Sequence, residues 1–306
     1  MIYEYALEPE MVATWGDRHN HRFFIRKFGL GEGRLVSRYP KTWARMVWDA
    51  FSGGSDMDRK RLEELLSRLK ETMVKRKDCC WDDEKKSWIE NALQEHSRHP
   101  FHAIITRNNP ETRPEILAES KLTGNGSNKW DIPHGRIVPR KAPEMTAAIE
   151  MMLSRCRWIK FIDPHISPSR PDYKTSLQAF LTILANERPV GPPAAVEIHT
   201  GLHGATGNFL KKAFELLIPA GLTVTLVQWQ ERPGGQRLHN RYILSDLGGV
   251  SFHHGLDTGA DGETDDITRL DREQYELHCK QYDRMAPAFD DAASSLVITG
   301  KLEKIS

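Results

Sequence analysis

The sequence has no hydrophobic run long enough to cross a membrane. Its first ten residues are acidic and lack the basic-then-apolar order of a signal peptide. The four cysteines form no Cys-x-x-Cys pair, which argues against a zinc ribbon or a dithiol redox motif; they are Cys79, Cys80, Cys156 and Cys279. We therefore expect a cytoplasmic protein with reduced thiols and no membrane association.

An excess of charge of either sign is also lacking. The chain carries 43 Lys+Arg against 42 Asp+Glu, a net charge of +1, so it has no overall attraction for nucleic acid. The glycines at 29, 31 and 33 are followed by no lysine-serine or lysine-threonine pair, and no buried strand precedes them. A phosphate-binding loop is therefore not indicated, and no internal repeat is present.

The first part of the chain is dominated by helical patterns. With 306 residues the chain is long enough for two domains. Apolar residues recur at helical spacing over residues 42–51, 56–77 and 82–96, and a short apolar run over 101–107 indicates a strand. We predict a mainly helical N-terminal domain over residues 1–140.

The pattern changes beyond the prolines at 139 and 143. Helices and strands then alternate, which favours an α/β domain with a mixed sheet flanked by helices over residues 141–306. The predicted helices cover residues 143–157, 173–186, 207–218 and 271–285, and the predicted strands cover 158–162, 195–200, 222–229, 238–246, 250–254 and 295–300.

Basic and aromatic residues alternate over residues 22–39. Such a stretch can bind nucleic acid through phosphate contacts and base stacking. It is equally typical of an element that packs its aromatics inward and leaves its arginines in solvent. The sequence alone leaves both interpretations open, and we favour the second.

One motif indicates chemistry. His239 and Arg241 lie two residues apart on a predicted strand and should share a face, whereas Asp246 lies at odd spacing and should lean the other way. A neutral imidazole can attack phosphorus or accept a proton from a nucleophile. A guanidinium can bind two phosphate oxygens and stabilise charge that develops in the transition state. Asp246 fits the role of an orienting group.

The motif resembles the signature of the phospholipase D superfamily, which is His-x-Lys followed by four residues and Asp. The chain reads HNRYILSD, so His239, Arg241 and Asp246 occupy the three signature positions, with arginine in place of lysine. The family's following Gly-Ser-x-Asn element is replaced by SFHHGLD, in which His253, His254 and Asp257 are candidate substitutes. The resemblance covers about residues 143–300.

The same resemblance extends to other positions. Superfamily members often open a catalytic half with a helix and a strand that ends in Asp-Pro-aromatic-Ile-Ser. This sequence has DPHIS after residues 158–162, which makes His165 a candidate catalytic residue and Asp163 a candidate substrate-binding residue. Asp257 and Glu273 are further candidates for substrate binding.

The resemblance implies a metal-independent phosphodiesterase without a cofactor, which we expect to be a nuclease acting on DNA or RNA. One histidine would form a phosphohistidine and another would protonate the leaving oxygen. With a single motif, either a homodimer or partner subunit completes the site, or His165 or His254 supplies the second role. The alternative is a catalytically inactive scaffold subunit of a nucleic-acid-processing complex, which the arginine and the missing Gly-Ser-x-Asn favour.

Two weaker metal patterns remain. His199 and His203 have the i, i+4 spacing of metal ligands, but the nearby glycines argue for a loop. The acidic segment 256–272 could bind a divalent cation, although its spacing matches no calcium loop, and a solvated loop is the favoured interpretation. We predict no metal site.

Overall fold

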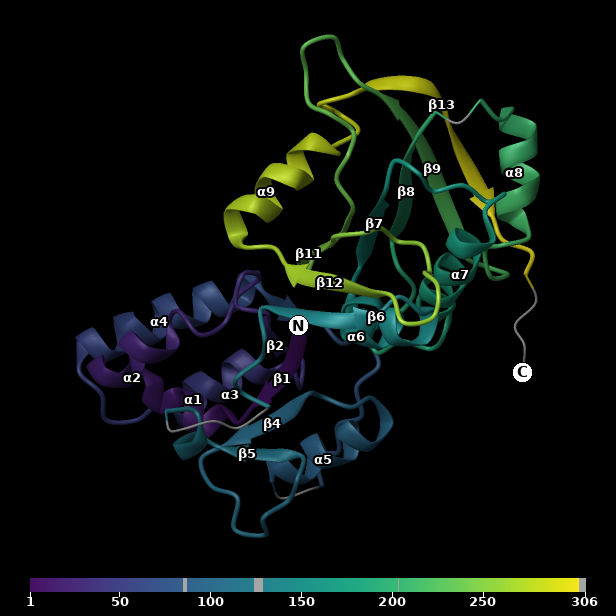
Figure 1. Cartoon of the computed structure of the whole chain (residues 1–306). Helices are drawn as coiled ribbons and strands as arrows, with labels where there is room; N and C mark the ends of the chain where they lie inside the picture. The colour runs from purple at the N-terminus through teal and green to yellow at the C-terminus, as the bar shows by residue number, and fades with distance from the viewer. Residues whose placement is uncertain (85–86, 124–128, 203, 303–306) are drawn as a thin grey trace. The chain divides into compact units, whose positions relative to one another are not determined.

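The computed structural model describes residues 1–84, 87–123, 129–202 and 204–302 (Figure 1). The chain divides into two compact units, each with its own sheet. The N-terminal unit comprises residues 2–133 and 189–191, and the C-terminal unit comprises Met1 and residues 134–188 and 192–306. Both combine helices with a sheet, so the protein belongs to the α/β class.

The N-terminal unit is built on a parallel sheet in the order β3-β2-β1-β4-β5. Its strands are β1 (Tyr3–Leu7), β2 (Arg34–Ser37), β3 (Met73–Val74), β4 (Ala103–Thr106) and β5 (Ile116–Ala118). Its helices are α1 (Pro9–Ala13), α2 (Arg18–Phe24), α3 (Trp43–Ala50), α4 (Asp56–Glu71) and α5 (Trp88–Arg98), with 3-10 turns η1 (Thr14–Gly16) and η2 (Glu119–Lys121). The expectation of a mainly helical domain is therefore not met.

A buried charge in the central strand explains part of that difference. Glu4 of β1 is fully buried and accepts hydrogen bonds from Arg76 Nε at 2.9 Å and Nη2 at 2.8 Å. Arg76 Nη1 donates to Glu95 of α5 at 2.7 Å. A buried ion pair inside a five-residue strand interrupts the apolar run by which a buried strand is recognised. β3 has only two residues, too few to leave a pattern.

The three helices predicted from periodicity are present as α3, α4 and α5. The start of α4 is fixed by a capping box, in which Ser55 and Asp58 each bond the backbone amide of the other. Its buried face consists of leucines at helical spacing, namely Leu62, Leu65, Leu66 and Leu69. Periodicity and capping together explain why this helix is readable from sequence.

The aromatics of the basic-aromatic stretch face the core. Phe24, Phe28 and Tyr39 are buried, and Phe24 stacks on Trp15 with ring centroids 3.7 Å apart. These rings are therefore not exposed for stacking on bases, and the inward-packing interpretation of residues 22–39 agrees with the structure.

The C-terminal unit holds an eight-stranded mixed sheet in the order β13-β9-β8-β7-β10-β11-β12-β6. Strands β7, β8 and β9 are parallel to one another, and the remaining pairs are antiparallel. The strands are β6 (Gly135–Pro139), β7 (Trp158–Ile162), β8 (Ala195–Gly201), β9 (Thr223–Gln230), β10 (Tyr242–Ser245), β11 (Gly248–Phe252), β12 (Thr264–Arg269) and β13 (Asp290–Thr299). The helices are α6 (Ala142–Arg155), α7 (Pro171–Ala185), α8 (Gly207–Glu215) and α9 (Arg272–Gln281).

This unit has the predicted mixed sheet with flanking helices. Helix α6 packs against α7, and α8 packs beside the edge strand β13 (Figure 1). The central strand β7 is fixed to α7 by Phe161 and Phe180, whose parallel rings lie 5.9 Å apart. This buried contact between β7 and α7 fixes the position of β7, whose carboxyl end contributes to the candidate site.

Two local predictions were wrong. Strand β10 begins at Tyr242, so His239 and Arg241 lie in the preceding segment rather than on the strand. The acidic segment 256–272 is not simply a loop, because it contains β12, which pairs with β11 and with β6. In β12 the acidic residues alternate between buried and exposed positions, and a buried acidic residue on a strand looks like loop composition in sequence.

Candidate functional site

Three neighbouring strands bring candidate residues to one edge of the C-terminal sheet. β7 ends where β10 begins, because Ile162 pairs with Tyr242, and β11 ends at the same edge, because Tyr242 also pairs with Ser251. The residues just outside these pairs therefore meet there: Asp163, Arg241 and His253. The carboxyl ends of the parallel strands in open α/β sheets are the usual place for ligand sites.

A pocket of about 330 Å³ opens at this edge. It is lined by His239, Asn240, Arg241, Tyr242, Ser251, Phe252, His253, Asp266 and Thr268. We call it the histidine pocket, because His239 and His253 both line it with exposed side chains. Asp266 contributes a carboxylate to the same lining, and this carboxylate opposes the attraction of anions.

Arg241 is the cation of the histidine pocket. Its Nη1 donates to the carbonyl of His253 at 3.5 Å, and its own carbonyl accepts from the amide of Phe252 at 3.0 Å. Its Nε is buried without a hydrogen-bond partner, and within the described part of the chain the guanidinium forms no ion pair. Most of its donors are therefore available to an anionic ligand.

Asp163 lies behind the pocket as a buried carboxylate. Its oxygens accept from the amides of His165 at 2.9 Å and Leu256 at 3.0 Å, and from the hydroxyl of Tyr173 at 3.0 Å. Burial raises the pKa of Asp163, although these hydrogen bonds and the positive charge of Arg241 act in the opposite direction. Asp163 therefore holds the protein's own loops together, and its oxygens are committed to them.

The turn that delivers His253 to the pocket is tightly constrained. Gly255 has a φ of +150°, a conformation that favours glycine. A Cβ at this position would lie 2.7 Å from Asp257 Oδ1 and 3.1 Å from Asp163 Oδ2. The close approach of two carboxylates thus requires glycine here.

Asp257 is occupied by ion pairs. Its Oδ1 lies 2.8 Å from Arg140 Nη2, and its Oδ2 lies 3.2 Å from Arg170 Nη2. Both contacts attach the end of the 253–257 turn to the start of α6 and to the segment before α7. Asp257, which the sequence suggested for substrate binding, therefore anchors this turn through both of its carboxylate oxygens.

Asp246 lies at the opposite end of β10. It accepts from the backbone amide of Arg157 at 2.7 Å and from Arg157 Nε at 2.9 Å. Five residues of extended chain separate it from Arg241, which corresponds to roughly 16 Å. Asp246 therefore orients Arg157 at the far end of β10, and in this structure it holds no group of the histidine pocket.

Glu273 also lies away from the pocket. It is in the first turn of α9, where Tyr275 donates from its hydroxyl to the carbonyl of Ser245 at 2.7 Å. That turn is therefore fixed beside the Ser245 end of β10, whereas His239 precedes the Tyr242 end.

The two other histidines proposed for catalysis do not line the pocket. His165 is exposed, and its backbone amide is bound to Asp163. The ring of His254 faces Asp265, with Nδ1 3.4 Å from Oδ1. His253 instead lines the same pocket as His239. Its outward direction follows from the alternation of side chains after β11, because Phe252 is buried and the next residue is exposed.

His199 is a structural histidine. It is buried on β8, accepts a hydrogen bond from Trp229 Nε1 at its Nδ1 (2.9 Å), and pairs through Nε2 with Glu197 at 3.0 Å. Burial lowers the pKa of His199, which favours the neutral ring with its proton on Nε2. Both nitrogens are thus used, and the metal-ligand interpretation is not supported; His203 lies outside the described residues. Elsewhere in the described ranges, no three His, Cys, Asp or Glu side chains are arranged to hold a metal ion.

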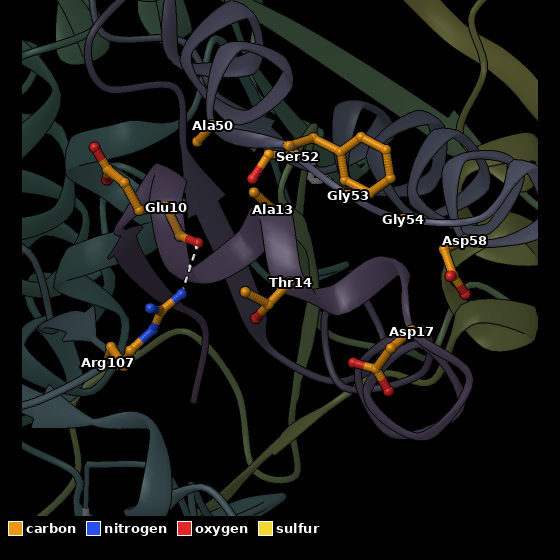
Figure 2. Close-up of a pocket in the computed structure, with 11 residues that line it drawn as sticks. Glu10, Ala13, Thr14, Asp17, Ala50, Ser52, Gly53, Gly54, Asp58 and Arg107 are labelled. Carbon is orange, nitrogen blue, oxygen red and sulfur yellow. Dashed lines mark hydrogen bonds between the residues drawn. The ribbon is translucent and has the colours of Figure 1, made fainter.

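A second pocket, of about 680 Å³, lies in the N-terminal unit (Figure 2). It lies where the chain leaves β1 and β4. From β1 the chain continues to β2 on one side of the sheet, and from β4 it continues to β5 on the other side. Arg107 donates from Nη2 to the carbonyl of Glu10 at 3.1 Å. Asp17, the N-cap of α2, and Asp58, the third helical residue in the capping box of α4, also line the pocket. Its lining contains no histidine, and its carboxylates outnumber its one guanidinium, so it is poorly suited to phosphate.

Comparison with models of known protein families gives no match, and comparison with curated proteins gives no significant match. The likeness to the phospholipase D superfamily therefore depends on the motif residues alone. Among the described helices, none combines the length and apolar character needed to cross a bilayer.

Proposed function

We propose that the histidine pocket binds a phosphodiester and that the protein is a metal-independent phosphodiesterase, with DNA or RNA as the expected substrate. The observation that carries the proposal is the presence of two exposed imidazoles and one guanidinium, free of ion pairs within the described residues, around a single pocket. A phosphodiester needs a nucleophile, a proton donor for the leaving oxygen and a cation for the non-bridging oxygens, and these three side chains match that list.

In the proposed reaction a ring nitrogen of His239 attacks phosphorus. The new N–P bond forms as the P–O bond to the leaving group breaks, and protonated His253 gives its proton to the departing oxygen. A water molecule then attacks the phosphohistidine, losing a proton to His253, and the N–P bond breaks to regenerate His239. Arg241 would donate two hydrogen bonds to the non-bridging oxygens throughout.

This assignment differs from the sequence-based one in its second histidine. His253 replaces His165 and His254, because it lines the pocket and they do not. A homodimer or partner subunit that brings a second His239 to the site remains a proposal for the proton donor, and it is distinguishable. If a second His239 is the proton donor, His253→Ala alone should keep its activity, whereas it should lose activity if His253 is the donor.

A second candidate is phosphate-ester binding without turnover. It is favoured by one observation: in the described part of the structure, no carboxylate hydrogen-bonds to the ring of His239 or His253. An imidazole that acts as nucleophile or base is usually oriented by a third group. Under this alternative the protein would be a binding subunit of a nucleic-acid-processing complex.

Hydrolysis assays separate the two candidates. Wild type and His239→Ala would be compared on bis(4-nitrophenyl) phosphate, single-stranded DNA, duplex DNA and RNA, each with a metal chelator present. The phosphodiesterase predicts chelator-resistant hydrolysis that is lost in the variant. Equal background rates for the two proteins would contradict it and favour the binding role, and loss of wild-type activity with chelator would contradict the metal-free mechanism.

The lining charges give a matched pair of binding variants. Arg241→Gln should weaken the binding of dimethyl phosphate about 10- to 100-fold, because a charge-assisted hydrogen bond contributes about 1.5–3 kcal/mol. Asp266→Asn should strengthen it, because it removes the carboxylate from the same lining. Titration followed by nuclear magnetic resonance would measure the affinity of each variant for dimethyl phosphate. Equal affinity in wild type and both variants would contradict the proposal that the pocket binds an anion.

A further inference from the structure

A buried carboxylate lies beneath the turn that carries His253. Asp265, on β12, has a fully buried side chain. Its Oδ1 accepts from the backbone amides of His253 at 2.9 Å and His254 at 3.0 Å, and it lies 3.4 Å from His254 Nδ1. β11 pairs with β12 as far as Phe252, so the carboxylate takes over as hydrogen-bond partner where the regular ladder stops.

Arg241 holds the other side of the same residue. Its Nη1 donates to the carbonyl of His253, while Asp265 accepts from the amide of His253. One anion and one cation therefore fix the two polar groups of a single backbone residue. Because the peptide is held at both groups, the direction in which the His253 side chain leaves the backbone is also fixed.

Each of these two charged residues retains one buried polar atom without a partner. Within the described ranges, these atoms are Asp265 Oδ2 and Arg241 Nε. Unpaired buried polar atoms are uncommon in native folds and each calls for an explanation. Burial of the Asp265 carboxylate is costly, and its hydrogen bonds from the two backbone amides offset part of that cost.

We infer that Asp265 is a positioning residue for the histidine pocket, because it holds the turn that places His253 in the same lining as His239. The expected effect of Asp265 on turnover rests on the proposed phosphodiesterase activity. Its role in holding the turn does not. Asp265 does not line the pocket, so it would act only through the turn. Two amides bound to one carboxylate are charge-assisted hydrogen bonds, and these are stronger than the same bonds to a neutral amide oxygen.

The test uses three variants of the full chain. Asp265→Ala removes the acceptor, and Asp265→Asn keeps an oxygen acceptor without the charge. Asp261→Asn is the matched control, because Asp261 is 99% exposed and pairs only with Lys141 among the described residues. The first readout is amide hydrogen exchange at His253 and His254. Exchange should be fastest in Asp265→Ala, intermediate in Asp265→Asn, and unchanged in the control.

The second readout is the division between kcat and KM on bis(4-nitrophenyl) phosphate. A misplaced catalytic group lowers turnover by up to about 100-fold, whereas Arg241 still binds the substrate. Asp265→Ala should therefore lose kcat with little change in KM, and Asp265→Asn should recover part of the loss. If Asp265→Ala does not fold, both amide exchange and the division between kcat and KM are measured on Asp265→Asn.

The outcomes separate the two ideas. Wild-type exchange rates in the Asp265 variants would overturn the inference, whatever the activity. A loosened turn with unchanged kcat would also overturn it, because the turn would then not position a reacting group. If wild type and His239→Ala hydrolyse equally, the proposed function fails and the catalytic part of the inference falls with it, while the exchange rates still test whether Asp265 holds the turn.

Discussion

The replacement of Gly255 by alanine tests the geometry of the histidine pocket most directly. The residue has a φ of +150°, where a side chain is strained, and such backbone strain costs about 1–3 kcal/mol. The added Cβ would also lie 2.7 Å from Asp257 Oδ1, closer than real contacts allow. Asp257 must then move away from Arg140, which it contacts at 2.8 Å in a mostly buried pair.

Together these effects should destabilise the C-terminal unit by about 2–4 kcal/mol, the backbone strain plus about 1 kcal/mol for a weakened hydrogen bond. For a unit of this size that corresponds to a fall in Tm of about 4–16 °C, at about 2–4 °C per kcal/mol. Scanning calorimetry and urea unfolding would measure the loss. Gly255 lies in the turn that carries His253 to the histidine pocket. The variant should therefore also weaken the binding of dimethyl phosphate there.

Gly221→Ala is the matched control. Gly221 lies in the same unit with a φ of +83°, but no atom lies within 4 Å of its added Cβ. It therefore reports the cost of a side chain at positive φ without crowding, and we expect a larger loss in Gly255→Ala from the contact with the carboxylates and from its more extreme φ. If Gly255→Ala is no more destabilising than Gly221→Ala, the tight convergence of Asp163 and Asp257 on the turn is refuted.

Three further predictions concern other charged groups. Arg76→Met should destabilise the N-terminal unit by about 3–5 kcal/mol in urea unfolding, because the buried carboxylates of Glu4 and Glu95 would lose their ion pairs with Arg76; a loss below 1 kcal/mol would contradict this. For Glu197, burial would raise the pKa, but the hydrogen bond from His199 and the charge of Lys160 lower it from 4.5 to about 2. The ionised form of Glu197 thus stabilises the fold above pH 4.5, and this stabilisation is lost as the pH falls towards 2. The difference in stability between wild type and Glu197→Gln should therefore shrink over that range; a constant difference would refute it. Arg241→Lys should keep phosphate binding within about tenfold of wild type but lose the contact with the His253 carbonyl, detectable as faster exchange of neighbouring amides, and unchanged exchange would show that Arg241 does not fix the turn.

The elements readable from sequence are those with long periodic patterns. Helix α4 is found because its leucines repeat at helical spacing behind a capping box. The strand β7 is found because its apolar residues lie between a helix and a proline. By contrast, the parallel sheet of the N-terminal unit is hidden, because its strands are at most five residues long and the central one contains the buried Glu4.

The candidate site was predictable only in part, for a related reason. His239 and Arg241 are close in sequence, so their shared location follows from local spacing. The contribution of His253 depends on the pairing of β11 with β10, and that of Asp265 depends on β12, which looks like an acidic loop in sequence. The partner of Asp246 was not predictable, because the motif spacing does not reveal at which end of β10 each residue lies.

The charge balance of the histidine pocket bears on what it can bind. One guanidinium faces the pocket with most of its donors unused, while Asp266 adds an exposed carboxylate to the lining. Each hydrogen bond from a guanidinium to a phosphate contributes about 1.5–3 kcal/mol, whereas repulsion from an exposed carboxylate at about 5 Å would cost about 1 kcal/mol in water. The one negative charge of a diester is matched by the one guanidinium of the lining, whereas the second charge of a monoester would find no further arginine or lysine there and would face Asp266. Under the proposed function we therefore expect the pocket to prefer a diester to a monoester or a polyphosphate.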